Sequence, residues 1–128
     1  MPITWTISAA DRLVTARAEG VITLQDIEAL LDDIVVKDAL SYRKMFDGRG
    51  SSGKYDDNDV MALGARISAY NSLGLAGAAA IVVDTPEQHD VALRFANIAK
   101  GKRPIRAFYS PDDARAWLDS NPSLDDSV

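Results

Sequence analysis

The residues with the most chemically suggestive spacing form the glycine-rich segment Gly48-Arg49-Gly50-Ser51-Ser52-Gly53-Lys54-Tyr55. It matches the G-x-G-x-x-G pattern of dinucleotide-binding turns and all but the last position of a phosphate-binding loop. A phosphate loop needs serine or threonine after the lysine to hold magnesium, and Tyr55 stands there instead. Three aspartates within 56–59 would also repel a phosphate at the start of the next helix. We therefore interpret the segment as a surface turn.

Two aspartates suggest a different chemistry. Asp47 ends a short strand-like segment at 44–47, and Asp84 follows the apolar run at 78–83. The carboxyl ends of parallel strands meet at one edge of a sheet, where open α/β folds place ligands. Paired acids at that edge could hold magnesium or act as general acid and base. A structural interpretation is stronger, because Asp47 opens a glycine turn and Asp84 precedes a helix cap.

Few other residues offer catalytic chemistry. The chain has no cysteine, which excludes disulfides, thiolate metal sites and cysteine nucleophiles. His89 is the only histidine, so an imidazole metal site is excluded, and its place in the first turn of a predicted helix favours an exposed side chain. We therefore predict that the protein is not an enzyme and needs no cofactor or metal.

Composition limits the classes of partner. A chain of 128 residues with 47% hydrophobic residues suits one domain, which we place at 1–121 with a polar tail at 122–128. The net charge of −5 disfavours binding to nucleic acid. The longest apolar run, at 75–83, is far shorter than the ~20 residues that span a bilayer. We predict a cytoplasmic protein without a membrane span.

The hydrophobic pattern predicts alternating strands and helices. Alternation at 3–7 and 13–19 predicts an antiparallel hairpin, and further strands are expected at 44–47, 78–83 and 105–109, with 78–83 the candidate for the centre of the sheet. Helices should start at the caps Thr23, Thr85 and Ser110. A further helix should carry an apolar stripe and end at Gly74, the stripe being Val60, Leu63, Ile67 and Tyr70. This order indicates an α/β fold with a mostly parallel five-stranded sheet and four helices.

The element order resembles the SpoIIAA-like family, which is related to the STAS (sulfate transporter and anti-sigma-factor antagonist) domains. The resemblance covers nearly the whole chain, and the residues that carry it are the 19–23 turn into the first helix, Phe46-Asp47, the 79–84 strand, Ile105-Arg106-Ala107-Phe108, and Ala114, Ala116, Trp117 and Leu118. It implies a SpoIIAA-like fold and, by analogy alone, a regulatory protein-interaction module.

The same resemblance implies a phosphorylation switch on a serine at a helix start after the third strand. Ser51-Ser52-Gly53 is the nearest match, so Ser52 is the expected acceptor if the chain has one. This chain departs from the family pattern, because three residues separate Asp47 from Ser51. Aspartates also follow Gly53 closely and would repel an added phosphate.

Two function classes follow. The first is a non-enzymatic regulatory module that binds a protein partner; its expected contact edge comprises Asp47, Ser51, Ser52, Tyr55, Met61 and Asp84. The sequence also leaves open the formation of a homodimer. The alternative is a carrier of a small, apolar ligand, held between the sheet and small residues of the second and third helices. Those residues are Gly64, Ala65, Ala69, Ala92, Ala96 and Ala99, although small residues more often allow close helix packing.

Overall fold

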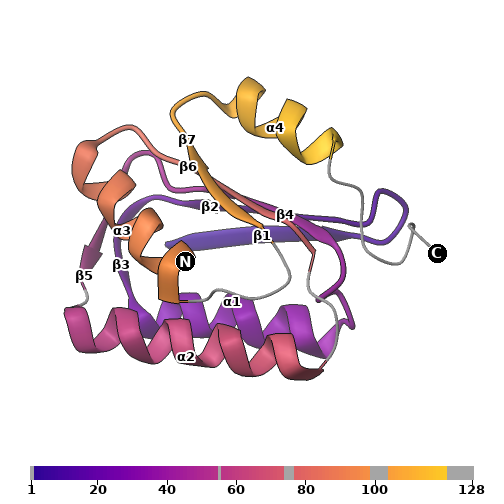
Figure 1. Ribbon diagram of the computed structural model, residues 1–128, viewed down its shortest axis with the longest axis horizontal. Helices are drawn as coiled ribbons and strands as arrows, with labels where there is room; N and C mark the ends of the chain where they lie inside the picture. The colour runs from indigo at the N-terminus through magenta and orange to yellow at the C-terminus, as the bar shows by residue number, and fades with distance from the viewer. Residues whose placement is uncertain (1, 55, 74–76, 99–103, 121–128) are drawn as a thin grey trace.

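The computed structural model describes residues 2–54, 56–73, 77–98 and 104–120. A five-stranded sheet lies between α4 on one face and α1, α2 and α3 on the other (Figure 1). The elements in chain order are β1 (Ile3–Ser8), β2 (Leu13–Ala18), β3 (Gly20–Thr23), α1 (Leu24–Val36), β4 (Arg43–Asp47), β5 (Ser51–Lys54), α2 (Asp57–Leu73), β6 (Ala79–Val82), α3 (Pro86–Ile98), β7 (Ile105–Phe108) and α4 (Pro111–Asp119).

The topology of the sheet confirms the predicted fold class. Its strand order is β1-β2-β4-β6-β7, with β1 antiparallel to β2 and all other neighbours parallel. The expected hairpin therefore forms one edge, and each later strand is added through a helical crossover. The central position belongs to β4 and not to β6, the strand that sequence favoured. Both strands lie in the interior of the sheet. Their order depends on the path of the crossover connections, and the apolarity of a strand does not indicate that path.

A second, two-stranded ribbon was not predicted. The segment interpreted as a turn into the first helix is β3, and the glycine-rich segment interpreted as a surface turn contains β5; the two pair in parallel. Gly20 begins β3 and Gly50 directly precedes β5, with φ of 72° and 76°, a conformation that glycine adopts without steric cost. The Gly20 amide donates to the Gly50 carbonyl over 3.1 Å, which joins the two turns.

The predicted helix starts are confirmed by their hydrogen bonds. In α1 the Thr23 hydroxyl accepts from the Asp26 amide, and the Asp26 carboxylate accepts from the Thr23 amide over 2.8 Å. The Gln88 amide donates to the Thr85 hydroxyl at the start of α3, and Ser110 caps α4 in the same way. Each side chain satisfies an amide that the first helical turn leaves without a partner.

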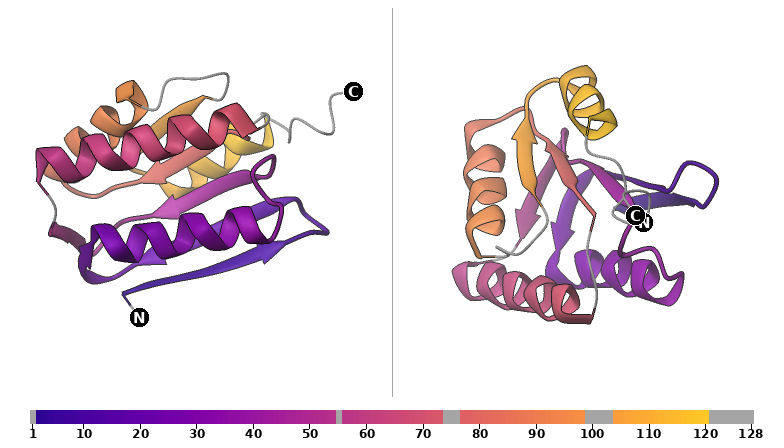
Figure 2. Two further views of the ribbon diagram at one scale, coloured as in Figure 1. Left: turned by 90° about the horizontal axis from the view of Figure 1, so that it is seen from below. Right: turned by 45° about the vertical axis from the view of Figure 1, so that its right-hand side comes forward.

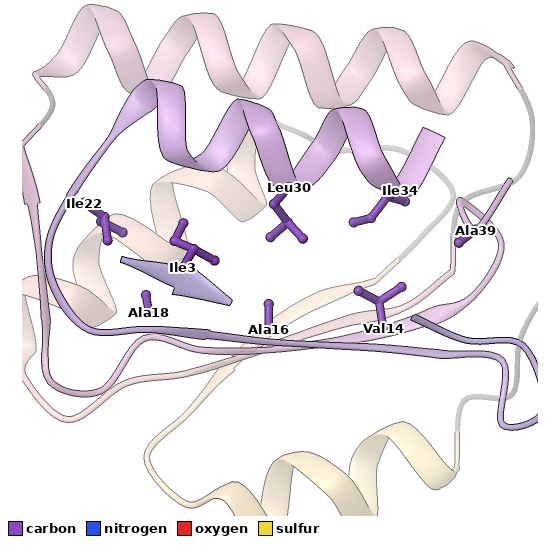
Figure 3. Close-up of a cluster of buried hydrophobic side chains, with 8 residues drawn as sticks. All are labelled: Ile3, Val14, Ala16, Ala18, Ile22, Leu30, Ile34 and Ala39. Carbon is purple, nitrogen blue, oxygen red and sulfur yellow. The ribbon is translucent and has the colours of Figure 1, made fainter. Parts of the chain in front are cut away.

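Two hydrophobic clusters pack α1 and α4 against opposite faces of the sheet. Side chains of successive strand residues point to opposite faces, so β2 directs Val14 and Ala16 toward α1 and Leu13 toward α4. Figure 3 shows Leu30 and Ile34 of α1 pointing down onto the first of these groups. The cluster under α4 contains Leu13, Ala78, Ala80, Val82, Ala114 and Leu118. Neither cluster includes a residue of α2.

Several expected features lie outside the described residues. They are the predicted tail at 122–128, the helix end at Gly74, and Tyr55. None of the helices in the described parts of the chain combines the length and the apolarity that crossing a membrane requires.

Candidate functional site

A large cavity lies between the sheet and the three helices on its α1 side. Its volume is about 570 Å³, its walls are mainly apolar, and it is partly open to solvent. Principal wall residues are Ala16, Phe46, Leu63, Ile67, Ile81 and Phe95. In volume and wall chemistry it falls within the range of small-molecule sites, about 300–1,000 Å³.

The floor of the cavity is one face of the interior strands. Ala79 and Ile81 of β6 line it, whereas Ala80 and Val82 point to the other face and are completely buried against α4. Phe46 of β4 lies beside Ile81 in register and, like Ile81, is only half-buried. The two faces of one sheet therefore differ: the α4 side is closely packed, and the α2 side leaves space above the strands.

The roof is helix α2. Leu63, Ile67 and Tyr70 recur at helical spacing and line the cavity, as the predicted stripe requires. Val60 and Leu63 are 2% exposed, while Ile67 and Tyr70 are half-buried. The main contacts of α2 are with α3 and, less extensively, with α1, rather than with the sheet. Figure 2 shows α1 and α2 side by side beneath the strands. Because α2 packs mainly on α3 and α1, the space between α2 and the sheet stays unfilled.

Polar contacts join α2 to the helices on both flanks. On the α1 side, Arg66 pairs with Glu28 at 2.6 Å and also with Asp32. The Arg66 Nε–H donates to the Tyr70 hydroxyl over 2.6 Å, and that hydroxyl donates to Asp32. We call these four residues the α1–α2 clasp. On the α3 side, Asp57 pairs with Arg94.

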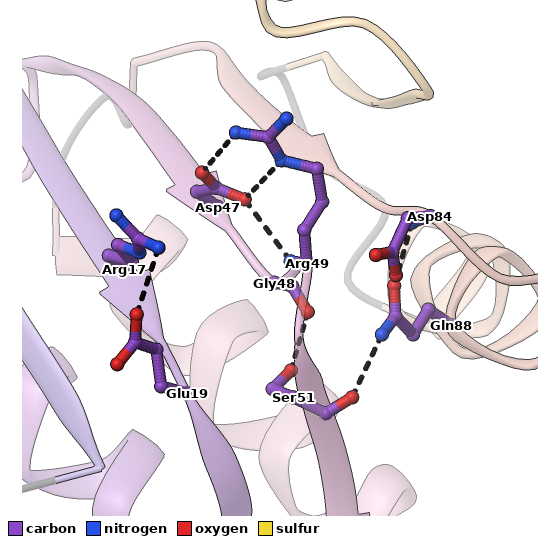
Figure 4. Close-up of polar contacts among 8 residues, drawn as sticks. All are labelled: Arg17, Glu19, Asp47, Gly48, Arg49, Ser51, Asp84 and Gln88. Carbon is purple, nitrogen blue, oxygen red and sulfur yellow. Dashed lines mark hydrogen bonds and ion pairs between the residues drawn. The ribbon is translucent and has the colours of Figure 1, made fainter.

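Polar groups gather at the end of the cavity where β4 and β6 finish. Figure 4 shows Gln88 of α3 reaching across to β5: its Nε2 donates to the Ser51 carbonyl, and its Oε1 accepts from the Asp84 amide, both at 2.8 Å. The Ser51 hydroxyl donates to the Gly48 carbonyl at 2.6 Å. Gln88 therefore fixes β5 to the turn between β6 and α3.

Asp47 and Asp84 lie at this same edge of the sheet, as predicted from the parallel strands, and Asp47 is paired with Arg49. Arg49 makes two side-chain hydrogen bonds to Asp47, at 2.9 and 3.0 Å, and its amide donates a third. These bonds lower the pKa of Asp47 against the opposing effect of burial. The carboxylate is thus held ionised by its own turn. Among the described residues, no three acidic or histidine side chains group as metal ligands.

The opposite end of the cavity carries one charged side chain. Lys44 of β4 lines the wall there, and its ammonium donates to the carbonyls of Leu40 and Tyr42 at 2.5 and 2.6 Å. These bonds satisfy carbonyls of the loop between α1 and β4. The cavity therefore runs along β4 between two polar ends.

The predicted edge residues are only partly brought together. Ser51 and Ser52 line the cavity, and Asp47 and Asp84 lie at the same end of the sheet. Met61 lies elsewhere, on the outer surface of α2, and is 61% exposed. Ser52 is exposed within β5 and not at a helix start, because α2 begins only at Asp57.

Two further expectations need correction. His89 is half-buried rather than exposed, because its ring stacks on Tyr109 with centroids 5.3 Å apart. Of the small residues expected to create a ligand space, Ala92 lines the cavity, whereas Ala65 and Ala69 are exposed. Ala65 and Ala69 of α2 therefore do not create the space, which depends on the position of that helix.

Comparison with known proteins identifies the fold. No family model and no curated protein matches the chain. A solved structure of an uncharacterised protein of the DUF3478 family from Shewanella loihica PV-4, described as having a SpoIIAA-like fold, is similar over 91% of each chain. The sequences are 21% identical, and the TM-score is 0.57. The chain therefore has a SpoIIAA-like fold, in agreement with the resemblance seen in its sequence.

Proposed function

We propose that this SpoIIAA-like domain binds a small, elongated, mainly apolar molecule without transforming it. The observation that carries the proposal is the apolar cavity of about 570 Å³ between the sheet and α2. Of the two function classes drawn from the sequence, ligand binding is therefore the one that the geometry supports better.

The size of the cavity argues for an occupant. At about 24 cal/mol per Å³, a dry void of about 570 Å³ would cost on the order of 14 kcal/mol, which equals the whole stability of a typical domain. Water could enter from the open side, but apolar walls offer it few hydrogen-bonding partners. An apolar ligand would replace this water and gain contact with the walls.

The cavity also limits the shape of the ligand. From Lys44 to Gly48 the floor extends about 13 Å along β4, at about 3.3 Å per residue. Polar groups stand at both ends, and the middle is formed by side chains such as Phe46 and Ile81. Glu87 lines the end near Ser51 and disfavours an anionic group there. An elongated molecule with an apolar body and an uncharged polar end toward Ser51 fits these walls.

Titration with the neutral apolar fluorophore N-phenyl-1-naphthylamine tests the proposal. We expect saturable, one-site binding to the purified chain, weakened at least tenfold by Ala79→Phe, which places a ring in the cavity. Met61→Ala is the matched control, because it removes an apolar side chain from the outer surface, and it should leave the affinity unchanged. Failure of the wild-type chain to bind, or equal effects of the two substitutions, would contradict the proposal.

Partner binding is the second candidate, and the exposure of Met61 favours it. This side chain is 61% exposed on the outer face of α2, where a partner can reach it. A protein retained by the wild-type chain and lost with Met61→Asp would support it. Within this candidate, Ser52 stays the expected phosphate acceptor if the chain has one: intact-mass analysis would then find a phosphate that Ser52→Ala removes.

A further inference from the structure

We infer that α2 is a lid over the cavity, that it opens on its α1 side, and that the α1–α2 clasp controls the exchange of the ligand. The inference rests on the proposed function, because it concerns the route by which a molecule reaches the same cavity.

The two halves of α2 are anchored differently. In the first half, Val60 and Leu63 are 2% exposed, and Asp57 pairs with Arg94 of α3. In the second half, Ile67 and Tyr70 are half-buried and face the cavity. The first half is therefore anchored by buried apolar side chains, whereas lifting the second half would expose Ile67 and Tyr70, which are already partly exposed.

The α1–α2 clasp joins that second half to α1 through side-chain ion pairs and hydrogen bonds. Arg66 is 32% exposed, and its partners Glu28 and Asp32 are 32% and 58% exposed. Exposed ion pairs of this kind are worth up to about a fivefold factor in an equilibrium constant, and salt weakens them. The clasp can therefore hold α2 closed at low ionic strength and still release it without a large energetic cost.

The end of the cavity near Ser51 is the competing route, and it is held differently. Gln88 bonds there to one main-chain carbonyl and one main-chain amide, and the Ser51 hydroxyl bonds to a third main-chain group. These bonds join neutral groups, so added salt does not screen them. Salt dependence and mutation can therefore separate the two routes.

Stopped-flow exchange of N-phenyl-1-naphthylamine on the full chain tests the lid. Arg66→Gln should raise the association and dissociation rate constants about fivefold while changing the dissociation constant less than about twofold. The wild-type rates should rise by a similar factor between about 0.01 M and about 1 M salt, as the Debye length falls from about 30 to about 3 Å. The Arg66→Gln rates should lose this dependence, because the screened pairs are gone.

Three further variants control the interpretation. Arg94→Gln removes the pair on the α3 side and should exchange the probe at the wild-type rate. Glu28→Gln breaks the same clasp from α1, so it should accelerate exchange in the same direction as Arg66→Gln and shows that the effect does not come from misfolding of α2. Gln88→Ala removes the bonds that hold the competing end near Ser51, and it should accelerate exchange less than Arg66→Gln does if the ligand passes on the α1 side.

The outcomes separate failure of the lid from failure of the proposed function. Normal probe affinity with rates that neither Arg66→Gln nor salt changes would overturn the lid alone. Acceleration by Gln88→Ala or by Arg94→Gln that equals or exceeds the acceleration by Arg66→Gln would also overturn it. Absence of probe binding in every variant and at every salt concentration would overturn the proposed function and the lid with it.

Discussion

Replacing Ala79 with isoleucine should stabilise the ligand-free protein, whereas the same substitution at Ala80 should destabilise it. The two residues are neighbours on β6 and point to opposite faces of the sheet. Ala79 is half-buried and lines the cavity, whereas Ala80 has no exposed surface and packs in the cluster with Ala114 and Leu118 of α4. The pair therefore compares equal changes in side chain on a single strand.

The structure sets the size of each effect. Isoleucine adds three carbon atoms, which contribute about 2.4 kcal/mol if they become buried at about 0.8 kcal/mol each, less about 1 kcal/mol of side-chain entropy. A net gain of about 1.5 kcal/mol should raise the Tm of a domain of this size by about 6 °C. At Ala80 the same atoms meet a filled core, and overpacking of this kind costs about 1–3 kcal/mol, or about 4–12 °C.

Calorimetric and urea unfolding of the wild type and both variants measure these differences. The urea midpoint should rise for Ala79→Ile and fall for Ala80→Ile with little change in slope, since the surface exposed on unfolding is nearly the same. A fall in Tm for Ala79→Ile as large as that for Ala80→Ile would mean that the space beside Ala79 is absent, and the cavity argument would fail.

Three other predictions concern the framework around the cavity. Gly77→Ala should destabilise the protein by at least about 2 kcal/mol in urea unfolding, because a Cβ there would lie 2.3 Å from the Tyr42 carbonyl oxygen; a neutral effect would show that the loop can move aside. Thr23→Ala should lower the free energy of unfolding by about 1 kcal/mol, because it removes the hydroxyl that caps α1, and Thr23→Ser should lower it much less. Equal losses in the two variants would show that the hydroxyl is not the cause. Because the pKa of Asp47 is lowered in the folded state, its contribution to stability is present above its unfolded pKa of about 4 and is lost as the pH falls through the folded value. Arg49→Gln should shift the carboxyl titration of Asp47, followed by NMR, back toward the ordinary range and reduce this acid dependence; an unchanged titration would exclude Arg49 as the cause.

Local sequence signals predicted most of the main sheet and all three capped helix starts. Thr23, Thr85 and Ser110 act within one helical turn, so the residues that decide their roles are adjacent in the chain. Alternation at 3–7 and 13–19 likewise predicted the hairpin of β1 and β2, which the structure confirms. The positions of Asp47 and Asp84 at one edge followed from the parallel arrangement alone.

The β3–β5 ribbon and the cavity depend on tertiary structure. Val21 and Ser52 are register partners, yet about 30 residues separate them, and a four-residue strand of serine, glycine and lysine carries no alternating pattern. The stripe of Leu63, Ile67 and Tyr70 predicted a buried helix face, and such a pattern does not distinguish contact with a sheet from contact with a cavity.

The sequence by itself therefore determined the strands of the main sheet, the helices with their caps, and the apolar stripe of α2, because those follow from interactions between near neighbours along the chain. Only the tertiary structure decided how far α2 stands from the strands, since that distance is set by its packing on α3 and by the pairing of Arg66 with Glu28 across two helices. The candidate binding site is the space left by this arrangement, and no single segment of the chain encodes it.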